Sequence, residues 1–248
     1  KSTTNPLPNT NDIIRIRVLE AAHGLRVLDY FEQSDEKPSY NSIERIITKI
    51  DSVLNKINQP DEKLIPVGIL DIHRVQLGEQ YRMLERTLPK LFSSRLSVEP
   101  QIIILEREDL NILLNEKLMT ESEDTKFWGS AILIDGNIQS NNNQLELHLN
   151  LKQAAGENLK SIIVPVEPNE PSNAIVRATP EIIQQLQNSS AVIKWNPEQE
   201  AEAFYQQGQF SLRHGRPHEA LILYETAHTL QPENVFYTIN LTILEWRL

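Results

Sequence analysis

The chain has 248 residues and a mass of 28.5 kDa, which is enough for one large or two small domains. An apolar share of 40% with 23% charged residues excludes wholesale disorder. A formal net charge of −10 without clustered Lys and Arg argues against nucleic-acid binding, and the lack of cysteine excludes disulfides and Cys-ligated zinc.

Residues 1–11 are polar and precede the first apolar pattern, so we interpret them as a processed or trimmed leader. The longest unbroken apolar runs, such as Ile102 to Leu105, fall far short of the ~20 residues that span a bilayer as a helix. We therefore predict no transmembrane helix.

Residues 12–60 are predicted to form a helical hairpin. The apolar positions of residues 12–32 favour a helix, although Ile14 to Val18 also alternates with arginine as a strand would. Residues 43–57 carry apolar side chains three and four apart, with Ser42 placed as an N-cap. Packing within its own domain is the first interpretation of this apolar stripe, and a coiled-coil or oligomer interface is the alternative.

An α/β segment is predicted over residues 61–190. Residues 64–72 are typical of a buried strand, residues 77–96 of a helix that Pro89 should kink, and residues 101–105 of a second strand. A strand, a helix and a strand in this order predict a right-handed parallel crossover. A further amphipathic helix is expected at residues 110–118.

Beyond Trp128 the apolar period changes to two. We predict three antiparallel strands near residues 131–138, 145–151 and 161–166, on the same sheet and with one face in water. The Asn-rich connection between the first two is typical of a hairpin turn, and Pro180 is expected to begin a short helix. The predicted fold class is α+β, a mixed sheet with a βαβ crossover and an antiparallel meander.

Residues 196–248 place small and aromatic side chains where two antiparallel helices would touch. Gly208 permits close approach, Gly215 opens the turn, Ala220 and Tyr224 line the second helix, and Pro232 ends it. This pattern resembles the tetratricopeptide repeat, whose period is ~34 residues. It covers one unit and the first helix of the next, so either the native protein continues beyond residue 248 or the last helix acts as a cap.

The tetratricopeptide resemblance implies a concave surface that binds an extended or helical peptide of a partner protein. The residues predicted to contact the partner are Tyr205, Gln209, Arg213 and Asn240.

The middle of the chain resembles the CsgG family of curli secretion channels. The resemblance rests on a strand that ends in Leu-Glu-Arg at Leu105, Glu106 and Arg107, and on the helical spacing of Leu110, Leu113, Leu114, Glu116 and Leu118. It extends over residues 64–186, and TolB amino-terminal domains and lipoprotein activators of penicillin-binding proteins share this α/β shape. It implies a periplasmic or outer-membrane-associated protein, and many relatives carry a lipid anchor upstream.

Charged residues follow the two predicted parallel strands. Asp71 and His73 end the first and Glu106 and Arg107 the second, at the edge where open α/β sheets bind ligands. A catalytic site is one interpretation; the favoured one is structural, because carboxylates stabilise a helix start. Neither a Gly-rich phosphate loop nor a hydrolase or metalloprotease motif occurs, so we predict no enzyme activity, no metal and no cofactor.

These patterns predict a non-catalytic scaffold or assembly factor of a bacterial cell envelope, with a protein or peptide partner. Three alternatives remain open: a ring-forming outer-membrane secretion subunit, an enzyme at the Asp71 and Glu106 strand ends, and a cytoplasmic regulator with a TolB-like module. The oligomeric state is left open, with a homo-oligomer as one alternative.

Overall fold

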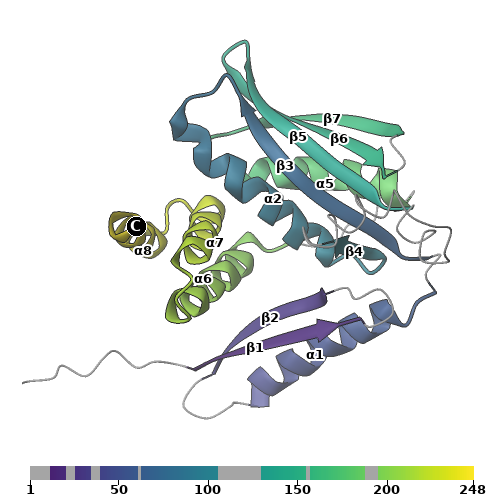
Figure 1. Cartoon of the computed structure of the whole chain (residues 1–248), viewed down its shortest axis with the longest axis vertical. Helices are drawn as coiled ribbons and strands as arrows, with labels where there is room; N and C mark the ends of the chain where they lie inside the picture. Colours follow the sequence, from purple (N-terminus) through teal and green to yellow (C-terminus); the bar gives the residue numbers. More distant parts are fainter. Residues whose placement is uncertain are drawn as a thin grey trace, which may run out of the picture.

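A computed structural model describes residues 12–20, 26–34, 40–60, 63–105, 130–154, 157–187 and 195–248. The leader, the expected helix at 110–118 and the second strand end at Glu106 and Arg107 lie outside these residues. The largest described element is a five-stranded mixed sheet in the order β4-β3-β5-β6-β7, with helices packed on one of its faces (Figure 1).

The prediction of a helical hairpin over residues 12–60 was wrong for its first half. Residues 12–34 form two antiparallel strands, β1 (Asp12–Leu19) and β2 (Arg26–Ser34), and only α1 (Tyr40–Ile57) is helical. The alternation from Ile14 to Val18 is the sequence signal that agrees with this outcome, because β-branched side chains at every second position suit a paired strand.

The parallel crossover is confirmed. Strand β3 (Ile65–Val75) leads through a short 3₁₀ turn, η2 (Glu79–Tyr81), into α2 (Arg82–Ser97), and β4 (Ile102–Leu105) then pairs parallel with β3. Helix α2 continues through Pro89, which lies in its interior.

The antiparallel meander is also confirmed. Strand β5 (Ile132–Asn141) pairs parallel with β3 and antiparallel with β6 (Gln144–Gln153), which pairs antiparallel with β7 (Asn158–Val166). The hairpin turn is narrower than the Asn-rich stretch: it consists of Asn142 and Asn143, both with positive φ. Two-residue turns of this kind match the twist of the strands, and Asn tolerates that conformation.

The helix expected to begin at Pro180 begins earlier. Helix α5 (Ser172–Gln187) passes through Pro180, and both Pro180 and Val176 are exposed. A proline leaves the carbonyl four residues before it without its helical partner, and water can satisfy that carbonyl at an exposed position. Pro180 therefore does not have to stand at the helix start.

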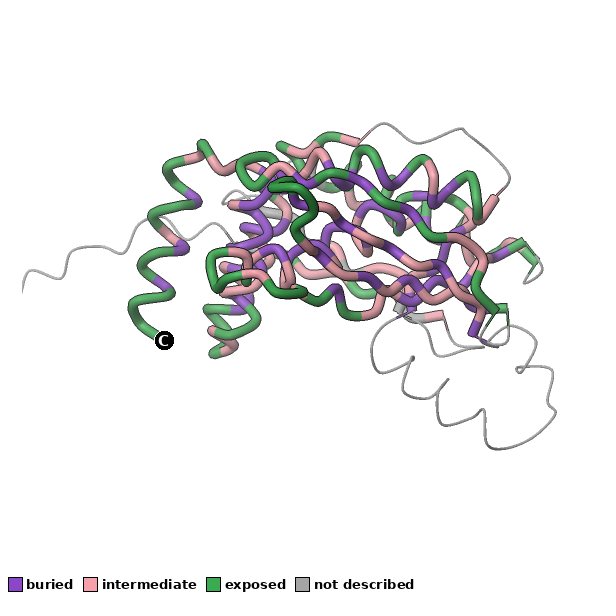
Figure 2. Tube along the Cα trace, turned by 90° about the horizontal axis from the view of Figure 1, so that it is seen from above, coloured by how far each residue is buried: buried purple, intermediate pink, exposed green. Residues whose placement is uncertain are grey.

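Three helices close the chain: α6 (Pro197–Arg213), α7 (Pro217–Leu230) and α8 (Val235–Arg247). Helix α2 lies between the sheet and α7 (Figure 1). One continuous core therefore joins the sheet, α2, α5 and the last three helices. In Figure 2 the buried segments run through the sheet and the packed helices, while the helix that ends at the carboxyl terminus is largely exposed.

Candidate functional site

Helices α6 and α7 pack closely at Gly208. A Cβ atom at this position would lie 2.5 Å from both Cδ1 and Cε1 of Tyr224 and 3.4 Å from the backbone oxygen of Ala220. Only a residue without a side chain fits under the tyrosine ring at that distance. The predicted close approach of Gly208 to the second helix is therefore confirmed.

The boundaries of these helices follow from local sequence. The Asn196 side chain accepts hydrogen bonds from the backbone N–H groups of Glu198 and Gln199 at the start of α6, and Asn234 caps α8 by accepting from the Phe236 N–H. Gly215, with φ +71°, provides the turn between α6 and α7. These signals set the lengths of the helices and hence which side chains face each other.

Tyr205 lies at the centre of an aromatic cluster that joins α6, α7 and α8. Its ring stacks on Tyr224 with centroids 5.1 Å apart and contacts Phe236 edge-on at 5.0 Å and Tyr237 at 5.2 Å. The Tyr237 hydroxyl donates a hydrogen bond of 2.9 Å to Glu202 of α6. Burial raises the pKa of all three phenols, so they stay neutral at physiological pH.

The four predicted contact residues differ in how far the structure exposes them. Tyr205 is only 5% exposed, so it supports the surface from beneath instead of offering a contact to a partner. The Gln209 amide donates to the Tyr205 hydroxyl at 2.8 Å, and Arg213, which follows at helical spacing, is exposed. Asn240 lies on α8, where its amide donates to the backbone oxygen of Phe236.

Phe236 is the residue that sequence reasoning missed. The residue is 54% exposed although its ring rests edge-on against the buried Tyr205. The available signal was the aromatic pair Phe236 and Tyr237 directly after the Asn234 cap. We call the exposed or half-buried side chains on this side of the two helices the α6–α8 face: Glu202, Gln209, Arg213, Phe236 and Asn240.

A second polar feature joins the last helices to α2. Glu225 of α7 has a side chain that is 1% exposed, and it forms an ion pair with Arg86 of α2. Burial raises the pKa of Glu225 to about 7, although the Arg86 charge opposes the shift. Within the described residues, Glu225 Oε2 and Arg86 Nε have no hydrogen-bond partner. A buried pair left incomplete in this way contributes little net stability.

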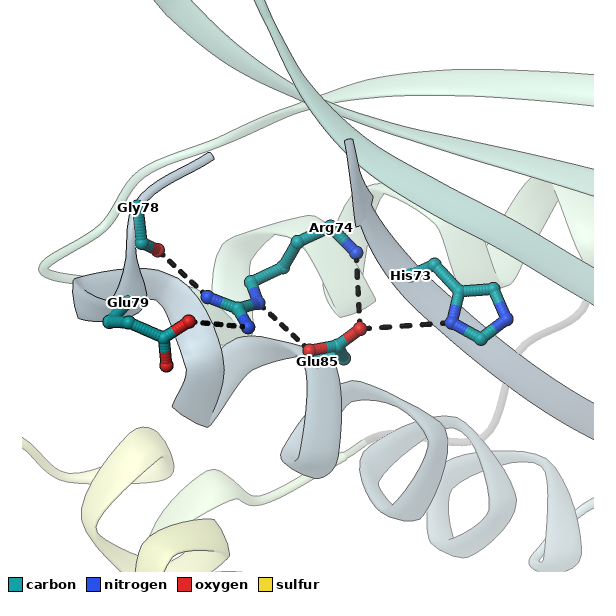
Figure 3. A network of polar contacts seen from close by, with 5 residues as sticks. All are labelled: His73, Arg74, Gly78, Glu79 and Glu85. Atoms are coloured by element: carbon teal, nitrogen blue, oxygen red, sulfur yellow. Dashed lines mark hydrogen bonds and ion pairs between the residues drawn. The ribbon is translucent and has the colours of Figure 1, made fainter. Parts of the chain in front are cut away.

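The end of β3 holds the network drawn in Figure 3. Glu85 of α2 accepts hydrogen bonds from Arg74 Nε at 2.8 Å and from the Arg74 backbone N–H at 3.3 Å, and His73 Nδ1 lies 3.7 Å from its Oε1. The guanidinium also donates to the Gly78 backbone oxygen at 2.9 Å and to Glu79 at 3.3 Å. Burial acts to raise the pKa of Glu85, but the Arg74 contacts outweigh it and the pKa is lowered.

This network ties the end of β3 to α2. Its central carboxylate is ionised and already engaged by a guanidinium and a backbone N–H, and a general base would need a pKa nearer the operating pH. Asp71 is exposed on β3, and Glu106 is outside the described residues. The geometry is that of a structural anchor between strand and helix.

An open cleft of about 380 Å³ lies between β2 and α1. It is lined by Tyr30, Glu44, Arg45, Thr48 and Lys49. The Lys49 ammonium is 5.9 Å from the centre of the Tyr30 ring. Two cationic side chains, Arg45 and Lys49, and one carboxylate, Glu44, therefore line this cleft.

In the part of the chain that the structure describes, no group of three or more His, Asp or Glu side chains could hold a metal ion. A search of the same residues finds no helix with the length and apolar character needed to cross a membrane.

No protein-family model matches the chain, and no curated protein sequence matches it. Among solved structures, TolB from Acinetobacter baumannii is similar over 50% of this chain and 29% of its own, with 14% identity and a TM-score of 0.33. A lipoprotein from Neisseria meningitidis is similar over 50% of this chain and 97% of its own, with 11% identity and a TM-score of 0.30. The match thus spans less than a third of the TolB chain, and likeness at these TM-scores carries no argument about function.

Proposed function

We propose that the protein is a non-catalytic scaffold or assembly factor of the bacterial cell envelope that binds a protein partner through the α6–α8 face. The observation that supports it most is Phe236, an exposed aromatic ring supported from beneath by the buried Tyr205. Rigid aromatic side chains of this kind supply much of the energy of protein interfaces at a low entropic cost.

The polar residues around Phe236 suit a peptide backbone. The amides of Gln209 and Asn240 donate to their own helices, and each has a carbonyl oxygen that can accept a hydrogen bond from an N–H of the partner. The expected ligand is an extended or helical segment with an apolar side chain for Phe236.

The tetratricopeptide character of this region and the envelope location belong to the same proposal. The first rests on the spacing of Gly208, Ala220 and Tyr224, and on the contact of Gly208 with both other residues. The second rests on the CsgG-like residues from Leu105 to Leu118. A scaffold of this kind needs no catalytic group.

The test is a comparative capture from envelope extract with the full chain immobilised. Phe236→Asp and the double variant Gln209→Ala, Arg213→Glu are compared with Arg177→Glu, which alters an exposed arginine of α5. We expect specific partners, identified by mass spectrometry, to bind the unchanged chain and the α5 variant and to be lost from both others. Equal recovery by all four proteins would exclude the α6–α8 face as the binding surface.

Tyr205 is unsuitable for this test, contrary to the expectation from sequence. Alanine there would remove the stacking on Tyr224 and the contacts with Phe236 and Tyr237, so lost binding would report unfolding.

A further inference from the structure

Helix α8 is apolar on two opposite sides. One side packs on the neighbouring helices through the buried residues Tyr237, Leu241 and Leu244. The other side carries four apolar residues with exposed fractions between 45 and 86%, which we call the outer α8 stripe: Val235, Ile239, Ile243 and Trp246. An apolar stripe along a helix normally faces another element. The outer stripe is therefore a surface that a further element should cover.

The four residues form a single line along the helix. They are spaced by four, four and three positions, so all lie within about a quarter of the helix circumference. Trp246 is the most exposed of them, at 86%. The isolated apolar side chains of an ordinary surface do not align in this manner.

The order of residues along α8 is self-complementary when a second α8 runs in the opposite direction. Pairing about a point between positions 240 and 241 places Val235 level with Trp246 of the second copy, and Ile239 within one residue of its Ile243. In the same register Arg247, which is exposed, is level with Asn234 of the other copy and one residue from its exposed Glu233. Apolar side chains meet apolar ones, and each end brings opposite charges together.

We propose that the outer α8 stripe is the interface for a second copy of this chain, packed antiparallel across a two-fold axis. A two-fold arrangement uses the same patch on both copies, as the sequence of α8 allows. The side chains can bury roughly 400 Å² per copy, about half of a standard interface, so the pairing is expected to be weak and reversible.

Sedimentation of the full chain over a range of concentrations tests the pairing. Ile239→Glu places a charge in the centre of the stripe, and Val176→Glu is the matched control because both residues are 52% exposed on helices. We expect the unchanged chain and the control to shift from monomer to dimer together, and Ile239→Glu to weaken association at least tenfold. Because the altered residues are exposed, circular dichroism should show all three folded.

Cross-linking tests the orientation, since the chain has no cysteine of its own. Single variants Ile239→Cys and Ile243→Cys are oxidised alone and as a mixture. An antiparallel pair predicts that the mixed disulfide between positions 239 and 243 forms fastest. Faster cross-linking of identical positions would overturn the antiparallel register.

A chain that stays monomeric at several hundred micromolar would overturn the proposal. If such a monomer still lost a captured protein on Ile239→Glu, the stripe would belong to a different partner. Loss of capture by Phe236→Asp with unchanged sedimentation would separate this interface from the partner-binding face.

Discussion

Gly208 of α6 lies directly beneath the ring of Tyr224 of α7, at a distance that no larger residue could occupy. The ring cannot retreat, because its other contacts include the stacked ring of Tyr205 at 5.1 Å. The absence of a side chain at Gly208 thus fixes how closely α6 and α7 approach each other. This position also places Phe236 against Tyr205 and so shapes the α6–α8 face.

Gly208→Ala is expected to destabilise the protein by about 1 to 3 kcal/mol. Alanine favours a helix over glycine by roughly 1 kcal/mol, but its Cβ would be 2.5 Å from two ring atoms. Urea unfolding measures the change, and Gln207→Ala on the same helix is the control. If Gly208→Ala were as stable as Gln207→Ala, the close packing of α6 and α7 would be refuted.

Glu225 should make stability fall as pH rises. Its pKa is about 7 in the folded protein and about 4.5 when unfolded, so the folded state binds more protons between these values. The stabilisation is full below pH 4.5 and is lost as pH rises through 7, by about 3 kcal/mol at most. Arg82 and Arg86 of α2 oppose this shift, and Glu245 of α8 reinforces it.

Thermal unfolding between pH 5 and pH 8 tests this dependence. Glu225→Gln should flatten the decline across that window, because the amide does not titrate. Glu219→Gln, an exposed position on the same helix paired with Arg216, should leave it unchanged. An unaltered decline in Glu225→Gln would show that another group is responsible.

Glu85 should have the opposite dependence on pH. Its folded pKa lies below the ordinary value, so its stabilisation is present above the unfolded pKa and is lost as pH falls through the folded pKa. Glu85→Gln is expected to cost about 1 kcal/mol at pH 7 and close to nothing in acid. Glu79→Gln affects a carboxylate that is 78% exposed and bound to the same Arg74, so it should cost less. Equal losses at pH 7 would contradict the anchoring role of Glu85.

Arg95 and Glu99 form a buried ion pair at the end of α2, with 3.1 Å between Nη1 and Oε1. Arg95→Met should destabilise the chain by about 3 kcal/mol, because it leaves a buried carboxylate without this partner. The double variant Arg95→Met, Glu99→Gln should recover part of the loss. Denaturant unfolding of the two variants provides the comparison, and no recovery would mean that packing of the arginine stem dominates.

Local sequence determined the crossover from β3 to β4, the meander and the three last helices. Each of these elements has its own short-range signal: a buried apolar run, alternation around Asn142 and Asn143, or the caps at Asn196 and Asn234. Such signals act within a few residues, so they can be recognised without knowing what packs against them.

Tertiary structure decided the remaining features. Residues 12–18 had apolar positions compatible with a helix or a strand, and pairing with β2 selected the strand. The contact between Glu225 and Arg86 joins positions far apart in sequence, and neither periodicity nor capping indicates it. Tyr205 was predicted to face a partner, but α7 and α8 cover it. Burial depends on which elements pack together in space, whereas a single sequence shows only the local conformational preferences of each segment.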